Sequence, residues 1–97
     1  MKVSTHPLAA DELVDAAVHY AREGSIALGS DLITEFERCV ALLQAHPGLG
    51  AVWGGRFRRL PIRRFPYSVV YLWSGDALRI IAIAHQRRRP GYWQDRT

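Results

Sequence analysis

Arginine, histidine and aromatic side chains are concentrated in the last third of this 97-residue chain, where they could bind an anionic partner. The planar guanidinium group suits two-pronged contacts with carboxylates and phosphates, and tyrosine and tryptophan add rigid apolar surface. The residues expected to form this binding surface are Arg58, Arg59, Arg63, Arg64, Arg87, Arg88, Arg89, Tyr92 and Trp93. Because they flank strongly β-forming runs, the pattern predicts a small sheet that presents positive charge.

His85, Arg88 and Tyr92 form a narrower candidate, a cluster for acid–base chemistry. Metal-free cleavage of RNA needs a base for the 2′-hydroxyl, an acid for the 5′-oxygen and cations beside the phosphate. The alternative interpretation is that His85 only bonds a backbone carbonyl at the end of its strand. The other histidines share no metal-ligand spacing and there is a single cysteine, so we expect neither a metal nor a cofactor.

Charge is distributed unevenly along the chain. The net charge is +4, but residues 1–55 carry −4 and residues 56–97 carry +8. Nearly all the cationic side chains are arginines, which favours a partner with carboxylate or phosphate groups. The alternative is a solvated basic face that serves only solubility.

The length and composition predict one domain over residues 1–97. No apolar run is long enough to cross a membrane, and residues 1–7 lack the apolar core of a signal peptide. Cys39 is the only cysteine, so an internal disulfide is excluded. We therefore expect a cytoplasmic protein without a membrane partner.

The first half of the chain predicts a strand and two helices. An alternating segment over residues 2–6 predicts an edge strand, and the helical spacing of apolar residues predicts a helix over residues 8–23. A second apolar stripe over residues 28–43 predicts another helix, with either Ser25 or Ser30 as its N-cap. Because only about three residues separate the helices, they should form an antiparallel hairpin.

The second half predicts three strands, over residues 56–62, 67–73 and 77–85, in an antiparallel meander. On the last strand one face is expected to carry Leu78, Ile80, Ala82 and Ala84, and the other Arg79, Ile81, Ile83 and His85. Residues 46–55 are expected to form a surface loop. Trp53 and Trp93 are expected to stay exposed for a partner. The predicted fold class is α+β, with an N-terminal edge strand, a helix hairpin and a three-stranded meander.

This order of elements, with several motifs, resembles the RelE/ParE superfamily of toxins from bacterial type II toxin–antitoxin systems. The motifs are Arg-Leu-Pro-Ile-Arg-Arg-Phe-Pro-Tyr at 59–67, Val-Val-Tyr at 69–71, Ile-Ala-Ile-Ala-His at 81–85 and Arg-Pro-Gly-Tyr-Trp at 89–93. The resemblance covers nearly the whole chain and implies a RelE-like fold. RelE-like members of the superfamily cleave mRNA on the ribosome, whereas ParE-like members inhibit DNA gyrase.

The residues that RelE-like cleavage would need are mostly replaced. Two arginines of the RelE pattern fall on Ser68 and Gln86, and a lysine falls on Pro61. Only Tyr92 and the neighbouring cation Arg88 remain in register. Loss of one preorganised charge typically lowers a rate by roughly 100- to 1,000-fold, so the replacements favour a ParE-like inhibitor that is not an enzyme.

The resemblance to ParE implies growth inhibition, plasmid stabilisation and three partners. These are a ParD-like antitoxin in a hetero-oligomer, DNA gyrase as the target, and operator DNA that is bound only through the antitoxin. The main alternative is a ribosome-dependent, metal-independent endoribonuclease that uses His85, Arg88 and Tyr92. A third is an inactive relative that only sequesters antitoxin or binds nucleic acid.

Overall fold

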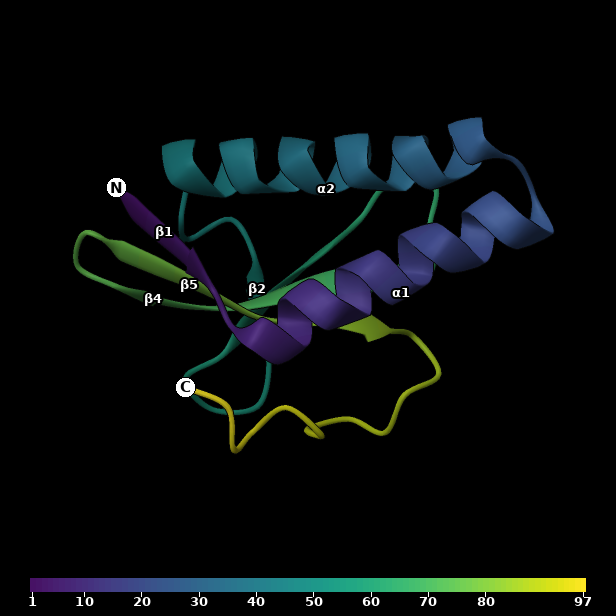
Figure 1. Cartoon of the computed structure of the whole chain (residues 1–97). Coiled ribbons are helices and arrows are strands. Elements are labelled where there is room, and N and C mark those ends of the chain that lie inside the picture. Colours follow the sequence, from purple (N-terminus) through teal and green to yellow (C-terminus); the bar gives the residue numbers. More distant parts are fainter.

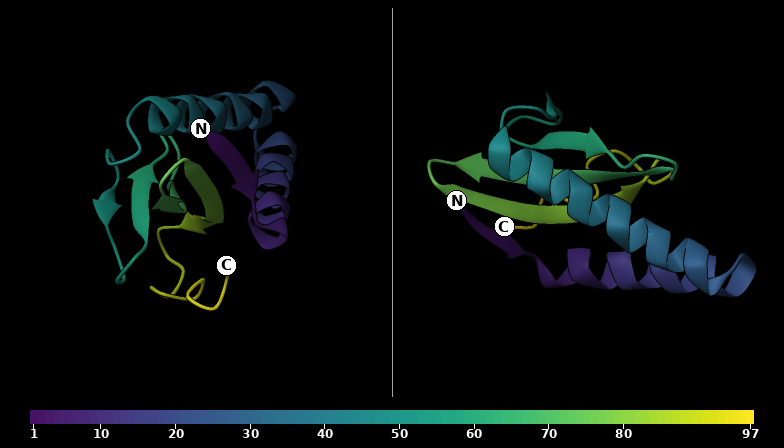
Figure 2. Two further views of the ribbon diagram at one scale, coloured as in Figure 1. Left: turned by 90° about the vertical axis from the view of Figure 1, so that its left-hand side faces the viewer. Right: turned by 90° about the horizontal axis from the view of Figure 1, so that it is seen from above.

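A helix hairpin packs on one face of a five-stranded sheet in the computed structural model, which describes residues 1–97 (Figure 1). In chain order the elements are β1 (Lys2–Thr5), α1 (Pro7–Glu23), α2 (Ile26–Ala45), β2 (Ala51–Val52), β3 (Arg58–Pro61), β4 (Tyr67–Ser74) and β5 (Ala77–His85). Residues 86–97, which we call the C-terminal tail, lie on the side of the sheet away from α2 (Figure 2). The predicted α+β class is confirmed.

Local hydrogen bonds define where both helices begin. The Nδ1 atom of His6 accepts the amide of Leu8 at 3.0 Å and caps α1. The Oγ atom of Ser25 accepts the amide of Leu28 at 3.0 Å and caps α2, so the earlier of the two candidate serines is the N-cap. Only Gly24 and Ser25 lie between the helices, and the predicted hairpin is confirmed.

The two helices are in close contact at Gly29. A Cβ atom at this position would lie 2.7 Å from the carbonyl oxygen of Ala17 and 3.2 Å from the Cβ of Ala21. Small residues on both helices therefore allow backbone contact. Apolar side chains of both helices belong to one core on the same face of the sheet.

The sheet order is β1-β5-β4-β3-β2, and β3, β4 and β5 form the predicted antiparallel meander. The predicted N-terminal edge strand, β1, pairs in parallel with β5, from Lys2↔Ala77 to Thr5↔Ile80, so the sheet as a whole is mixed. The two helices and strands β2 to β4 lie between β1 and β5 in the chain and supply the long connection that a parallel pair requires. Residues 46–55, predicted as a loop, contain the short edge strand β2, whose backbone pairs with β3.

A β-bulge interrupts the predicted alternation along β5. Opposite Val70–Tyr71 of β4 the pairing skips Ile81, so β5 contains one extra residue. After the bulge Ile83 belongs to the core under the helices, whereas Ala82 and Ala84 belong to the core under the tail. The expected facing of these three residues is therefore wrong.

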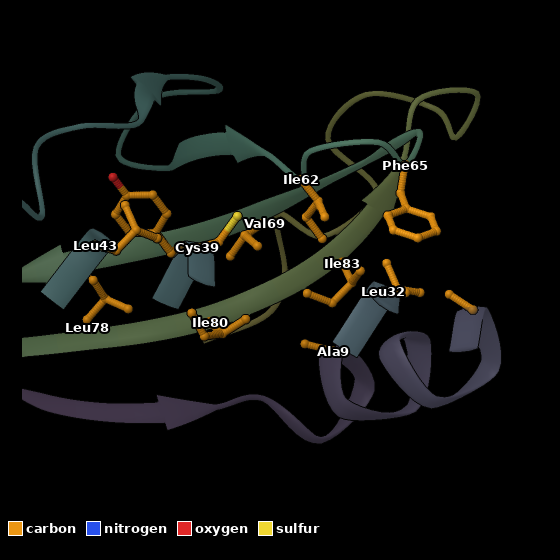
Figure 3. Packing of buried hydrophobic residues seen from close by; sticks show 12 residues of the cluster. Ala9, Leu32, Cys39, Leu43, Ile62, Phe65, Val69, Leu78, Ile80 and Ile83 are labelled. Carbon is orange, nitrogen blue, oxygen red and sulfur yellow. The ribbon is translucent and has the colours of Figure 1, made fainter. Parts of the chain in front are cut away.

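The larger core lies between the helix hairpin and the sheet, as Figure 3 shows. Leu32, Cys39 and Leu43 of α2 lie over the apolar side chains of β4 and β5. Burial, with the nearby Glu35 carboxylate, raises the pKa of the Cys39 thiol. Cys39 therefore acts as a small apolar core residue and not as a nucleophile.

A second core lies on the other face of the sheet, under the C-terminal tail. It contains Phe57, Val70, Ile81, Ala82, Ala84 and Trp93. Trp93 is only 1% exposed and its ring centroid lies 4.4 Å from that of Trp53, so the expectation of an exposed Trp93 is wrong. The tail folds back over the sheet, a long-range contact that local sequence does not reveal.

No helix of the fold is long and apolar enough to cross a membrane.

Candidate functional site

The sheet register brings two groups of arginines to one end of the molecule. Tyr67, the first residue of β4, pairs with His85, the last residue of β5. The β3–β4 turn, with Arg63 and Arg64, and the start of the tail, with residues 87–89, therefore leave the sheet at the same end.

Four arginines at this end are exposed and form no ion pair within the chain. We call them the exposed arginine group: Arg63, Arg87, Arg88 and Arg89. Since none of them lies within ion-pair distance of a carboxylate of the chain, their guanidinium groups are available to another molecule.

Two of the predicted binding arginines have partners inside the chain. Arg58 donates from Nη1 to the carbonyls of Gly48 at 3.2 Å and Gly50 at 2.9 Å, so it holds the loop before β2. Arg64 has a left-handed φ of 72° and forms an ion pair with Asp31 of α2 at 3.3 Å. The first contacts fix the loop before β2, and the ion pair fixes the β3–β4 turn beside the exposed arginine group.

Arg59 lies on the tail side of the sheet. Its guanidinium carbon is 4.0 Å from the ring centroid of Trp53, which in turn contacts Trp93. Arg59 is exposed, so the edge of this aromatic pair carries a positive charge that a partner could reach.

A cavity of about 220 Å³ opens between α1 and the segment that follows β5. It brings His85, Arg88 and Tyr92 together, beside Asp15 and His19 of α1. The three residues of the proposed acid–base cluster are thus neighbours in space. Their hydrogen bonds decide what chemistry they could perform.

His85 is held by a bond that differs from the expected one. Its Nδ1 atom accepts the backbone amide of Arg87 at 3.0 Å, so its backbone partner is an amide and not a carbonyl. The ring packs edge-to-face on Tyr67, with centroids 5.0 Å apart. Only the Nε2 atom of His85 remains free to exchange a proton with a ligand.

Tyr92 is a poor candidate for a general base. Its hydroxyl donates to Oε2 of Glu12 at 2.8 Å. Burial first, and then the hydrogen bond to Glu12, raise the pKa of Tyr92 above its ordinary value. The hydroxyl therefore keeps its proton at neutral pH and is already committed to a carboxylate, while Arg88 lies over the ring at 4.0 Å.

Glu12 and Arg96 form a two-pronged ion pair near the cavity, and neither residue was among the candidate site residues predicted from the sequence. Arg96 donates from Nη1 to Oε1 at 2.8 Å and from Nη2 to Oε2 at 3.1 Å. The hydrogen bond to Glu12 raises the pKa of Arg96. The two residues are 84 positions apart, so no local pattern could have paired them.

A helix hairpin on one face of a short sheet, with arginines gathered at the end where β4 begins and β5 ends, is the architecture that the RelE/ParE resemblance implies. The architecture is therefore the one expected of a small toxin of the RelE/ParE superfamily.

Comparisons with known proteins identify the family within this class. The model of the family described as ParE toxin of type II toxin-antitoxin system, parDE, matches residues 3–90, so the chain belongs to the ParE toxin family. A solved structure described as the chromosomal ParDE TA system from P. aeruginosa has a similar fold, with a TM-score of 0.76. It is 22% identical over 88% of this chain and 95% of that chain, a level at which likeness shows the fold alone. No match was found among curated proteins.

Proposed function

We propose that residues 1–97 act as one toxin domain that inhibits DNA gyrase and is neutralised by a ParD-like antitoxin. The observation that supports this most directly is the exposed arginine group, which has no carboxylate partner within the chain. A basic surface of this kind attracts acidic partners and raises their rate of association. Membership of the ParE family supports gyrase as the target.

The antitoxin would bind through a segment that carries both acidic and apolar residues. Its carboxylates would pair with the exposed arginine group while its apolar side chains cover neighbouring surface. Antitoxin and gyrase would then compete for one surface, and operator DNA would be bound only through the antitoxin. Growth inhibition, plasmid stabilisation and a cytoplasmic location follow from this proposal.

A second candidate function is ribosome-dependent cleavage of mRNA, and the cavity favours it because it gathers His85, Arg88 and Tyr92. Two observations count against it. Ser68 and Gln86 stand where the RelE pattern has arginines, so charge that would stabilise the transition state is missing. The hydroxyl of Tyr92 is held by Glu12 and keeps its proton.

The experiment that separates the two functions assays one purified preparation in parallel, for gyrase supercoiling and for mRNA integrity in a translation extract. The proposal predicts that supercoiling is inhibited, that mRNA stays intact and that added antitoxin restores supercoiling. Arg88→Ala combined with Arg89→Ala should weaken the inhibition. Arg22→Ala is the matched control, because it removes an exposed, unpaired arginine of α1. Cleaved mRNA with normal supercoiling would overturn the proposal.

A further inference from the structure

The backbone of β5 loses its partner strand halfway along one side. The ladder between β1 and β5 ends at Thr5↔Ile80, and the amide of His6 then donates to the Ile80 carbonyl at 2.8 Å. Beyond this point the chain turns into α1, which begins at Pro7. The polar backbone groups of β5 that follow need other partners.

Glu12 and Arg96 supply these partners. Oε1 of Glu12 accepts the amide of Ile83 at 3.1 Å, and Nη1 of Arg96 donates to the carbonyl of Ile81 at 3.1 Å. The same carboxylate binds both terminal nitrogens of Arg96 and the hydroxyl of Tyr92. We call Glu12, Tyr92 and Arg96 the Glu12 clasp, because one carboxylate of α1 joins the edge of β5 to the C-terminal tail.

The clasp is shielded from solvent. The side chains of Arg96 and Glu12 are 12% and 18% exposed, against 54% and 45% for the Arg64–Asp31 pair. A shielded ion pair is screened less by salt, and removal of one partner leaves the other charge poorly compensated. Loss of Glu12 should therefore release the tail instead of costing only a surface contact.

The clasp is connected directly to the arginines that follow β5. The guanidinium of Arg88 lies 4.0 Å from the ring centroid of Tyr92, and the amide of Tyr92 donates to the carbonyl of Arg89 at 3.3 Å. The Glu12 carboxylate holds the hydroxyl at the far end of the same ring. The direction in which Arg88 and Arg89 point thus depends on where Glu12 holds Tyr92.

We propose that Glu12 is a positioning residue that fixes the C-terminal tail, so that residues 87–89 form a preformed binding surface before any partner arrives. This inference rests on the proposed function. A surface that is ordered in advance avoids the entropy cost of ordering it on binding, so the clasp raises affinity without touching the partner. Tyr92 and Arg96 lie beyond residue 90, where the match to the family model ends.

The test compares Glu12→Ala with Glu23→Ala in the full chain. Glu23 is an exposed carboxylate of α1 that forms no ion pair. Hydrogen exchange and gyrase inhibition are measured on each variant. In Glu12→Ala the amides of Ile83 and the tail should exchange at least about tenfold faster, while the amides of Leu32 and Val69 keep their protection. The concentration for half-inhibition should rise by about tenfold.

Further variants separate positioning from general stability. Glu12→Gln keeps an acceptor oxygen for the Ile83 amide, so it should restore part of the protection and part of the inhibition. Arg96→Met breaks the clasp from the tail side, so it should show the same faster exchange of the tail and the same weaker inhibition as Glu12→Ala. It also provides the test if Glu12→Ala does not fold.

Two results would overturn the inference: equal tail protection in Glu12→Ala and Glu23→Ala, or a released tail with unchanged inhibition. If the unaltered chain does not inhibit gyrase, the proposed function fails. Hydrogen exchange then still decides whether the clasp orders the tail.

Discussion

The hydroxyl of Tyr71 accepts a hydrogen bond from the amide of Gly50 at 3.0 Å and donates one to the carbonyl of Pro47 at 2.6 Å. Tyr71 is fully buried in β4, so a core side chain holds the loop that leads into β2. A Cβ atom at Gly50 would lie 2.6 Å from this hydroxyl, which explains why glycine occupies the position. Arg58 holds the same loop by donating a hydrogen bond to the carbonyl of Gly50.

Replacing Tyr71 with phenylalanine should destabilise the protein by about 1–3 kcal/mol, because the buried amide of Gly50 loses its acceptor. Urea denaturation measures the free energy of unfolding. Tyr20→Phe is the matched control, since no hydrogen bond engages the Tyr20 hydroxyl, and it should change stability by less than about 0.5 kcal/mol. Equal effects of the two substitutions would show that the Tyr71 bonds do not stabilise the loop.

Gly29→Ala should destabilise the helix hairpin by about 1–3 kcal/mol, although alanine has the higher helix propensity. The new Cβ would lie 2.7 Å from the carbonyl oxygen of Ala17, so the helices must move apart. Thermal unfolding measures the effect. Ser30→Ala, at the next, exposed position, should be nearly neutral, and a stabilised Gly29→Ala variant would contradict the close contact.

Trp93→Ala should destabilise the protein by about 3–5 kcal/mol, because it removes the largest side chain of the core under the tail. Binding of an apolar dye should rise as this sheet face becomes exposed. Trp73, which is 42% exposed, supplies the control, and Trp73→Ala should cost much less. Similar losses for both tryptophans would mean that the tail does not cover the sheet in solution.

Substitution of Arg58 should affect stability, whereas substitution of Arg63 should affect binding. Arg58→Ala removes two hydrogen bonds to the loop and should lower the free energy of unfolding by about 1–3 kcal/mol. Arg63→Ala should leave stability within about 0.5 kcal/mol but weaken binding of an acidic antitoxin segment several-fold. Calorimetric titration at two salt concentrations measures this, and the difference should shrink at high salt. If Arg63→Ala binds normally, Arg63 lies outside the interface.

Stability should fall when the pH rises above about 10, the ordinary pKa of tyrosine. Burial raises the pKa values of Tyr67, Tyr71 and Tyr92 in the folded protein. The folded state then binds more protons than the unfolded state, so this contribution is fully present below pH 10 and is lost as the pH rises toward the folded pKa values. Urea midpoints between pH 8 and 11 measure the slope, and Tyr92→Phe should flatten it. An unchanged slope in that variant would contradict the burial of Tyr92.

Helix positions and the antiparallel meander followed from the sequence because their signals are local. The apolar stripe of α2 and the cap at Ser25 involve residues within a few positions of one another. The strands 67–73 and 77–85 are dense in β-branched and aromatic residues and are joined by a short turn.

Features that depend on distant residues did not follow from the sequence. The bulge at Ile81 arises from the pairing of β5 with β4, and an alternating apolar run gives no sign of it. The parallel β1–β5 pair and the burial of Trp93 depend on how the two ends of the chain return to the sheet. A carboxylate near a helix start, such as Glu12, is favourable by itself, so nothing local in the sequence indicates its bond to Arg96, 84 positions away.

The most direct test of the central claim is induction of this chain alone in a bacterium, with DNA synthesis and translation followed separately by pulse labelling over the first minutes. A ParE-family toxin that inhibits gyrase should stop DNA synthesis first and induce the SOS response, and co-expressed antitoxin should prevent both effects. Early arrest of translation with cleaved transcripts, while DNA synthesis continues, would contradict the account and assign the activity to His85, Arg88 and Tyr92.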